Sequence, residues 1–94
     1  MLAIARALML EPDLLILDEP SLGLSPIVTE EVFRLLTAIK EVGVTILLVE
    51  QMVDKALGIS DYAYILETGK IVFSGTREEV KNSDDIVKAY LGSV

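Results

Sequence analysis

Two short runs of aliphatic residues most constrain how this chain can fold. The first is LLIL at 14–17, and the second is VTILLVE at 44–50. Both are apolar enough to be strands covered on both faces, as the strands of a parallel sheet are. Neither approaches the roughly 20 apolar residues that a membrane-spanning helix needs. We therefore expect two buried strands that lie in one sheet.

A helix is predicted between these strands. Ser25 is a suitable N-cap, Pro26 suits the first helical position, and Gly43 marks the end of the helix. Strand, helix and strand then form a βαβ unit with a right-handed crossover and parallel strands, which predicts an α/β fold. Apolar residues on one stripe of this helix are expected to face the core; they are Val28, Val32, Leu35, Leu36 and Ile39.

Smaller elements are predicted on either side of this unit. A helix is expected over 1–10, before Pro12, and a short one over 52–57, ending near Gly58. The segment YAYILETGKIVFSG at 62–75 predicts a β-hairpin that turns at Thr68 and Gly69. We expect three aromatic side chains to pack the hairpin against the sheet, namely Tyr62, Tyr64 and Phe73.

Two further helices are predicted at the end of the chain. Thr76 and Glu79 match the Ser/Thr-x-x-Glu capping box, which opens a short helix. Ser83 is expected to cap a last helix that runs to Leu91. We expect residues 1–94 to form a single partial domain with a parallel core, a hairpin and C-terminal helices.

Composition narrows the chemistry that is possible. The chain has 94 residues with no cysteine and no histidine, so acid–base catalysis would depend on carboxylates. A net charge of −7 argues against nucleic-acid binding. Hydrophobic residues make up 52% of the chain, more than so short a chain can cover. We therefore expect one sheet face or edge to be bare and the isolated chain to form a homo-oligomer.

Polar residues follow both predicted strands. Asp18 and Glu19 end the first strand, and Glu50 and Gln51 end the second. Parallel strands bring their carboxyl ends to the same edge of a sheet, where ligands of open α/β folds bind. One interpretation is a loop whose acids are merely solvated. The other is a catalytic site in which Asp18 orders Mg²⁺ on nucleotide phosphates and Glu19 polarises an attacking water.

Three segments together resemble one family. LLILDEPSLGLSP at 14–26, VTILLVEQ at 44–51 and ILETGKIVFSGT at 65–76 are similar to the C-terminal part of an ATP-binding-cassette (ABC) transporter ATPase. The resemblance implies that Asp18 closes the Walker B strand and holds Mg²⁺ through water. It also implies that Glu19 is the catalytic base.

The same resemblance assigns roles to the loops after both strands. It places the D-loop at Ser21–Leu24 and implies that Ser21, Leu22 and Gly23 contact the nucleotide. Gln51 falls on the catalytic switch position, where histidine is usual, and Leu24 stands where the D-loop usually has Asp. A glutamine can still hydrogen-bond a γ-phosphate or a water, but it cannot carry a positive charge.

The resemblance covers only part of such a domain. The sequence contains no G-x-x-x-x-G-K-[ST] phosphate loop and no LSGGQ signature. The expected fold is thus a partial P-loop NTPase-like fold that lacks the N-terminal half of the domain. ATP and Mg²⁺ are expected cofactors of the complete parent, and neither is expected to bind tightly to this fragment. We expect the fragment to be inactive alone, so whether it counts as an enzyme stays open at this point.

By resemblance, the parent is the ATP-hydrolysing subunit of an amino acid importer, most like those for branched-chain amino acids. Its implied partners are a second ATPase subunit and transmembrane permease subunits, on the cytoplasmic face of the membrane. The alternative is a non-catalytic self-associating or regulatory interaction module. The missing phosphate loop favours this alternative for the isolated chain, whereas Asp18 and Glu19 favour an ATPase for the parent.

Overall fold

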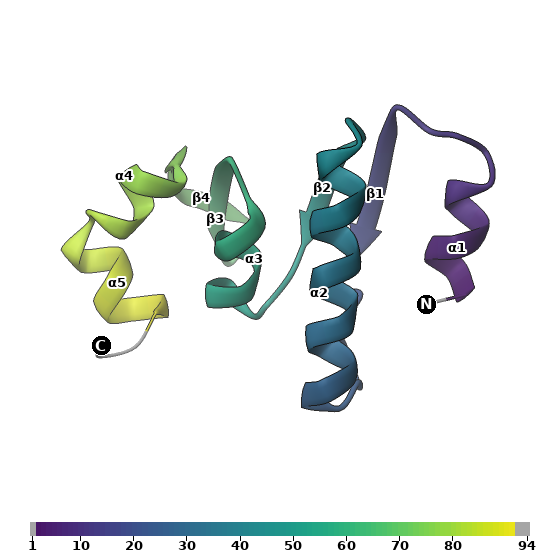
Figure 1. The fold of residues 1–94 in the computed structure, drawn as a ribbon. Helices are drawn as coiled ribbons and strands as arrows, with labels where there is room; N and C mark the ends of the chain where they lie inside the picture. Colours follow the sequence, from purple (N-terminus) through teal and green to yellow (C-terminus); the bar gives the residue numbers. More distant parts are fainter. Residues whose placement is uncertain (1, 92–94) are drawn as a thin grey trace. The chain divides into compact units, whose positions relative to one another are not determined.

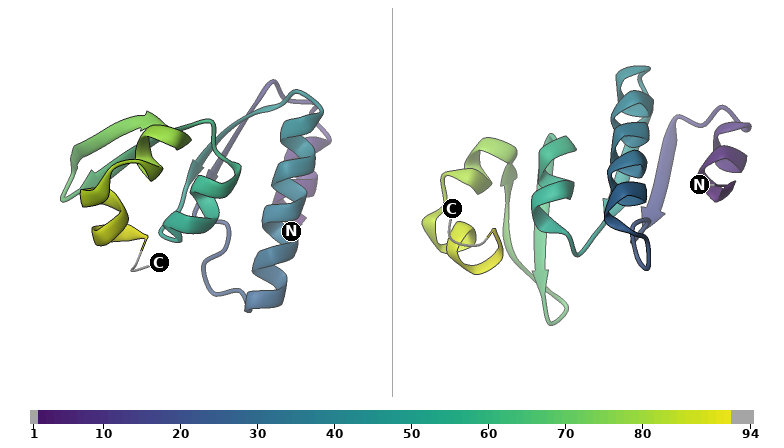
Figure 2. Two further views of the ribbon diagram at one scale, coloured as in Figure 1. Left: turned by 60° about the vertical axis from the view of Figure 1, so that its left-hand side comes forward. Right: turned by 60° about the horizontal axis from the view of Figure 1, so that its bottom comes forward.

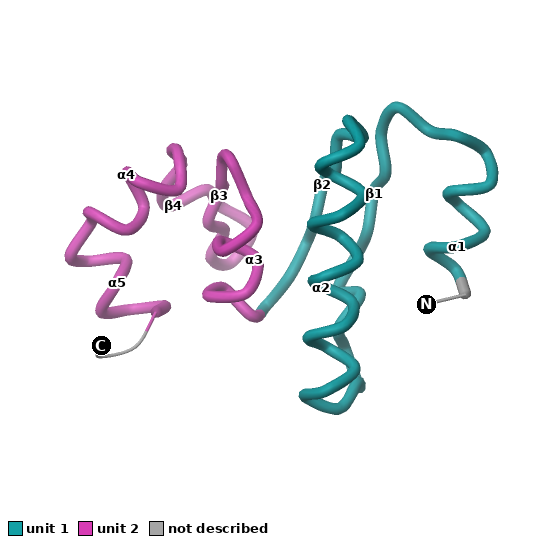
Figure 3. Tube along the Cα trace, viewed as in Figure 1, with its two compact units in different colours: residues 1–51 teal, residues 52–94 magenta. Residues whose placement is uncertain are grey.

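The structure, a computed structural model, describes residues 2–91 and contains two compact units. The units are Met1–Gln51 and Met52–Val94 (Figure 3). The predicted helix start at Met1 lies outside the described residues. Within residues 2–91, none of the helices combines the length and the apolar character that a membrane span requires.

The first unit contains the predicted parallel βαβ core, preceded by a helix (Figure 1). Its strands pair in parallel, with Ile16 opposite Leu47 and Asp18 opposite Val49. The long helix lies alongside the strand pair in every view (Figure 2). The elements in chain order are α1 (Leu2–Leu8), β1 (Leu14–Asp18), α2 (Pro26–Glu41) and β2 (Thr45–Val49).

The ends of α2 are set by the residues that the sequence indicated. The Ser25 hydroxyl accepts a hydrogen bond from the N–H of Val28 at 3.3 Å, and Pro26 occupies the first turn. Gly43 has a φ of +101°, a left-handed conformation that ends helices at little cost for glycine.

The buried face of α2 differs from the predicted stripe. Val28 and Leu35 are only half-buried, whereas Thr29 and Phe33 are buried. The buried face is therefore centred closer to Thr29 and Phe33 than the predicted stripe is. A search for apolar residues does not find Thr29, because its side chain is polar. The buried residues of α2 are Thr29, Val32, Phe33, Leu36 and Ile39.

One face of the β1–β2 pair is bare. Alternate residues of each strand point to opposite faces, and paired residues share a face. The expectation that both faces are covered is wrong for one of them, because α2 lies along only the other. We call the exposed set the open sheet face; its residues are between 51% and 61% exposed, and they are Leu14, Ile16, Leu47 and Val49. The bare face expected of so short a chain is thus present.

Over the described residues 52–91, the second unit consists of a hairpin and three short helices. The hairpin strands are antiparallel, and the two residues between them, Thr68 and Gly69, both have positive φ, at 51° and 75°. The predicted short helix ends at Ile59, two residues after Leu57, and so ends near Gly58 as expected. The elements are α3 (Val53–Ile59), β3 (Tyr62–Glu67), β4 (Lys70–Thr76), α4 (Arg77–Lys81) and α5 (Asp84–Tyr90).

The core of this second unit lies on one face of the hairpin. Leu57, Ile65, Val80 and Ile86 form a buried cluster, against which Phe73 packs. Phe73 therefore packs in the core of the second unit, and packing of the hairpin against the parallel sheet stays a prediction.

The other hairpin face carries tyrosines. Tyr62 and Tyr64 are 52% and 61% exposed, so the expectation that they pack the hairpin is wrong. Their positions alternate with that of Ile65, which faces the core, and their rings instead lie 5.2 Å apart.

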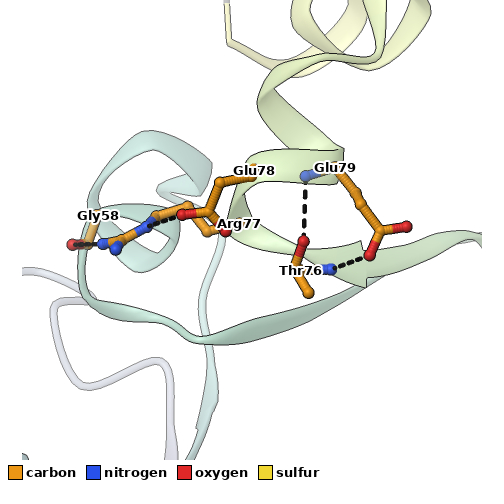
Figure 4. Close-up of polar contacts among 5 residues, drawn as sticks. All are labelled: Gly58, Thr76, Arg77, Glu78 and Glu79. Atoms are coloured by element: carbon orange, nitrogen blue, oxygen red, sulfur yellow. Dashed lines mark hydrogen bonds and ion pairs between the residues drawn. The ribbon is translucent and has the colours of Figure 1, made fainter.

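The capping box of α4 is formed as predicted (Figure 4). The N–H of Glu79 donates to the Thr76 hydroxyl at 3.2 Å, and the N–H of Thr76 donates to the Glu79 carboxylate at 3.1 Å. Arg77, beside this box, donates to the carbonyl oxygen of Gly58 at 3.1 Å. Ser83 takes the N-cap position of α5 as predicted, although its side chain makes no capping hydrogen bond.

Candidate active site at the strand ends

The two strands of the first unit bring their polar ends together. Asp18 lies opposite Val49, and the backbone N–H of Glu19 donates to the carbonyl oxygen of Val49 at 2.7 Å. The backbone hydrogen bonds between the two strands therefore continue one residue past the end of β1. This arrangement confirms that the carboxyl ends of both strands share one edge of the sheet.

Asp18 and Glu19 differ in their surroundings although they are adjacent. Asp18 is exposed, and Glu19 is half-buried with a φ of +48°. A left-handed conformation costs a residue with a side chain about 1–2 kcal/mol, and such strain is common at functional sites. It turns the chain out of the sheet directly after Asp18. Within residues 2–91, neither carboxylate has a hydrogen-bond or ion-pair partner, so both can accept hydrogen bonds from a ligand or water.

Two tight turns follow Glu19. The N–H of Leu22 donates to the carbonyl oxygen of Glu19, and the N–H of Leu24 donates to that of Ser21, both at 3.1 Å. Gly23 has a φ of +77°, which glycine adopts without steric cost. These turns leave Leu22 72% exposed and Gly23 exposed, so both are open to a ligand or a second chain.

Ser21 lies inward rather than outward. It is 6% exposed, and its hydroxyl donates a hydrogen bond to Oε2 of Glu50 at 2.8 Å. The other carboxylate oxygen of Glu50, Oε1, accepts from the backbone N–H of Gln51 at 3.1 Å. The Gln51 side chain is exposed. The nucleotide contact assigned to Ser21 stays a prediction.

The contact between Glu50 and Ser21 is not predicted from the sequence. The sequence pattern places Glu50 at the sheet edge, whereas the resemblance assigns the catalytic role there to Gln51. One signal was available: a carboxylate at the end of an apolar strand, at the edge that also carries a serine two residues after Glu19. The structure joins Ser21, Glu50 and the backbone of Gln51, and links Glu19 to this group only through the backbone.

The donor set fits a magnesium ion only in part. Asp18 offers the hard oxygen that Mg²⁺ prefers. Residues 2–91 contain no group of three or more histidine, cysteine, aspartate or glutamate residues that could hold a metal. A single carboxylate suits an ion that arrives on nucleotide phosphates and keeps most of its waters. Asp18 therefore suits the role of a single protein ligand in a nucleotide–Mg²⁺ site.

Sequence comparisons give relatives over nearly the whole chain. It is 48% identical over 92 residues to the high-affinity branched-chain amino acid transport ATP-binding protein BraG of Pseudomonas aeruginosa. This alignment covers 98% of this chain and 40% of the relative. It is 44% identical over 95 residues to the probable branched-chain amino acid transport ATP-binding protein LivF of Archaeoglobus fulgidus, covering 100% of this chain and 40% of the relative. No protein-family model matches the chain.

Solved structures match the fold as well. A nucleotide-free ATP-binding cassette from an ABC transporter is 32% identical with a TM-score of 0.76, over 96% of this chain and 37% of that one. The cbiO1 protein of Clostridium perfringens, part of an ABC transporter complex, is 33% identical with a TM-score of 0.74, over 92% and 35%. The chain spans about two fifths of the length of the curated relatives it matches.

Proposed function

Since this chain belongs to the ATP-binding-cassette ATPase family and spans part of such a domain, we propose that it carries the water-activating part of an ATP-hydrolysing transport subunit. The observation that carries the proposal is the pair of carboxylates at the end of β1. Asp18 and Glu19 lie side by side in sequence at the carboxyl edge of a parallel sheet, with both carboxylates available to a ligand.

Glu19 is proposed as the general base. Its half-buried carboxylate follows a strained turn that fixes its backbone against Val49. A carboxylate held in this way can accept a proton from a water aimed at a terminal phosphate. Mg²⁺, when bound, supplies neutralisation of phosphate charge, and Asp18 would hold it through water.

The proposed roles of the loop residues follow from their exposure. The exposed amide of Gln51 would hydrogen-bond the γ-phosphate or the attacking water. Leu22 and Gly23 would contact the nucleotide or a second ATPase subunit from the turns after Glu19. Ser21 would approach the nucleotide only with its backbone, because its hydroxyl is engaged by Glu50.

The substrate and partners are proposed from the relatives. Those from Pseudomonas and Archaeoglobus carry names of branched-chain amino acid transport, so import of branched-chain amino acids is the proposed process. A second ATPase subunit and transmembrane permease subunits are the proposed partners, at the cytoplasmic face of the membrane. These relatives favour the ATPase over a non-catalytic interaction module.

Activity requires residues that this sequence does not contain. A phosphate loop would have to hold ATP in front of Glu19, and no G-x-x-x-x-G-K-[ST] occurs in the 94 residues. We therefore propose that the isolated chain does not hydrolyse ATP and binds it weakly. Phosphate release by the purified chain above that of its Glu19→Gln variant would contradict this proposal.

For the isolated chain, we propose a second copy as the cover of the open sheet face. Among residues 2–91, β1 and β2 pair only with each other, so each also has an unpaired edge that favours association. An interface of roughly 1,600 Å² is the standard size for a specific complex. A homo-oligomer would remove Ile16 and Leu47, at the centre of this face, from water.

The function is tested in a complete domain. A graft in which this chain replaces the matching two fifths of the Pseudomonas relative would restore the missing segments. We expect the graft to bind and hydrolyse ATP, and we expect Asp18→Asn to weaken the dependence of the rate on Mg²⁺. The proposal is rejected if the graft folds and binds ATP but hydrolyses it at an unchanged rate in both the Asp18→Asn and the Glu19→Gln variants.

A further inference from the structure

The carboxylate of Glu50 bridges two loops that are far apart in sequence. One oxygen accepts from the Ser21 hydroxyl at 2.8 Å and the other from the backbone N–H of Gln51 at 3.1 Å. Because both oxygens are used, the carboxylate plane is fixed relative to both loops. We propose that Glu50 is a positioning residue, which couples the turns at Ser21–Leu24 to the backbone of Gln51.

Burial makes the contact with Ser21 persistent. Ser21 is 6% exposed, so a hydroxyl that left Glu50 would have little access to water in compensation. Hydrogen bonds to an ionised acceptor are also stronger than those between neutral groups. Glu50 is itself half-buried, which limits competition from solvent. Of the two hydrogen bonds of Glu50, the one from Ser21 is therefore the more persistent.

Gln51 is the residue that can move when the turns at Ser21–Leu24 are displaced. Its side chain is exposed, and its backbone N–H is held by the carboxylate of the preceding residue. A displacement of the exposed Leu22–Gly23 segment would shift Ser21, then Glu50, and then the backbone from which the Gln51 amide projects. The importance of this coupling for catalysis rests on the proposed function. The coupling itself needs no nucleotide.

The test uses the 94-residue chain itself, labelled with ¹⁵N. In Ser21→Ala, we expect the Gln51 amide proton to move upfield and to exchange with solvent about fivefold faster, as loss of one hydrogen bond allows. Ser21→Thr keeps the hydroxyl and should restore both values. Ser25→Ala is the matched control, because Ser25 caps α2 by accepting a hydrogen bond from the N–H of Val28.

A second variant covers the case in which Ser21→Ala fails to fold. Glu50→Ala should move the Gln51 amide at least as far, with the amides of Val32 and Leu36 in the core of α2 unchanged. The proposal is overturned if Gln51 does not respond to either variant, if Ser25→Ala moves it equally, or if Ser21→Thr fails to restore it. Since no ATP is present, failure here leaves the roles of Asp18 and Glu19 unaffected.

Discussion

Ser21 donates a 2.8 Å hydrogen bond to Glu50, which lies 29 residues further along the chain at the end of the neighbouring strand. This contact joins the loop after β1 to the end of β2 at the edge that carries Asp18 and Glu19. A parallel pair of strands has no tight turn to fix one end against the other. The side-chain bridge supplies that fixation where the proposed chemistry takes place.

Removing the bridge should destabilise the first unit. Glu50→Ala deletes the acceptor of two hydrogen bonds and leaves the buried Ser21 hydroxyl without its Glu50 contact. We expect the free energy of unfolding to fall by about 1–3 kcal/mol. Urea denaturation followed by circular dichroism measures it. Glu31→Ala, on the exposed face of α2, is the control and should change it by less than about 0.5 kcal/mol. Equal effects of the two changes would contradict the account.

The hairpin turn offers a stabilising substitution. Thr68 is β-branched yet has a φ of +51°, and with Gly69 it forms a two-residue turn in which both φ values are positive. Asn followed by Gly is the preferred pair for such a turn. We expect Thr68→Asn to raise the free energy of unfolding by about 1 kcal/mol, and Gly69→Ala to lower it by a similar amount. Urea titration followed by tyrosine fluorescence would record both changes, and a loss of stability in Thr68→Asn would show that the turn is assigned wrongly.

Tyr90 should titrate above the ordinary value for a tyrosine. Its hydroxyl donates to Glu67 at 2.7 Å, and this hydrogen bond, followed by desolvation and the Glu67 charge, raises the pKa of Tyr90 above 10.0. The neutral form is favoured in the folded state, so this stabilisation is fully present below pH 10 and is lost as pH rises through the raised pKa.

Absorbance at the tyrosinate band measures this titration. Tyr90→Phe should remove the Tyr90 phase and so identify it, and Glu67→Gln should move that phase to lower pH. A Tyr90 phase that stays at the same pH in Glu67→Gln would contradict the contact.

Self-association should depend on the open sheet face. We expect Ile16→Lys or Leu47→Lys to shift the chain towards the monomer, since a charge would then have to be buried between copies. Light scattering coupled to size exclusion measures the mass. Val42→Lys is the matched control, because Val42 is 81% exposed but lies in the turn after α2. Salt should promote association by screening the net charge of −7. A monomer at micromolar concentration would contradict the proposed oligomer.

Local patterns allowed most elements to be predicted. Ser25 with Pro26, and Thr76 with Glu79, form their caps with residues three or fewer positions away, so the sequence contains all the partners. The turn at Thr68 and Gly69 is local in the same sense. The parallel pairing of β1 and β2 was accessible because a connecting helix leaves few alternatives.

Contacts between distant residues were not predictable in the same way. Tyr62 and Ile65 are both apolar enough for a core, and only the placement of Val80 and Ile86 decides which hairpin face is buried. The bridge from Ser21 to Glu50 depends on rotamers at two strand ends. The positive φ of Glu19 follows no residue preference, since glutamate has none for that conformation.

The central claim is that Glu19 activates the water that attacks ATP. The most direct measurement is steady-state phosphate release by the graft on the Pseudomonas relative, with ATP binding measured in parallel. Glu19→Gln should lower the rate by about 10²–10⁴-fold and leave ATP affinity unchanged, as expected for loss of a general base. Glu31→Gln, the same change at an exposed position of α2, should leave both unchanged. A Glu19→Gln graft that releases phosphate at the unmodified rate would contradict the account.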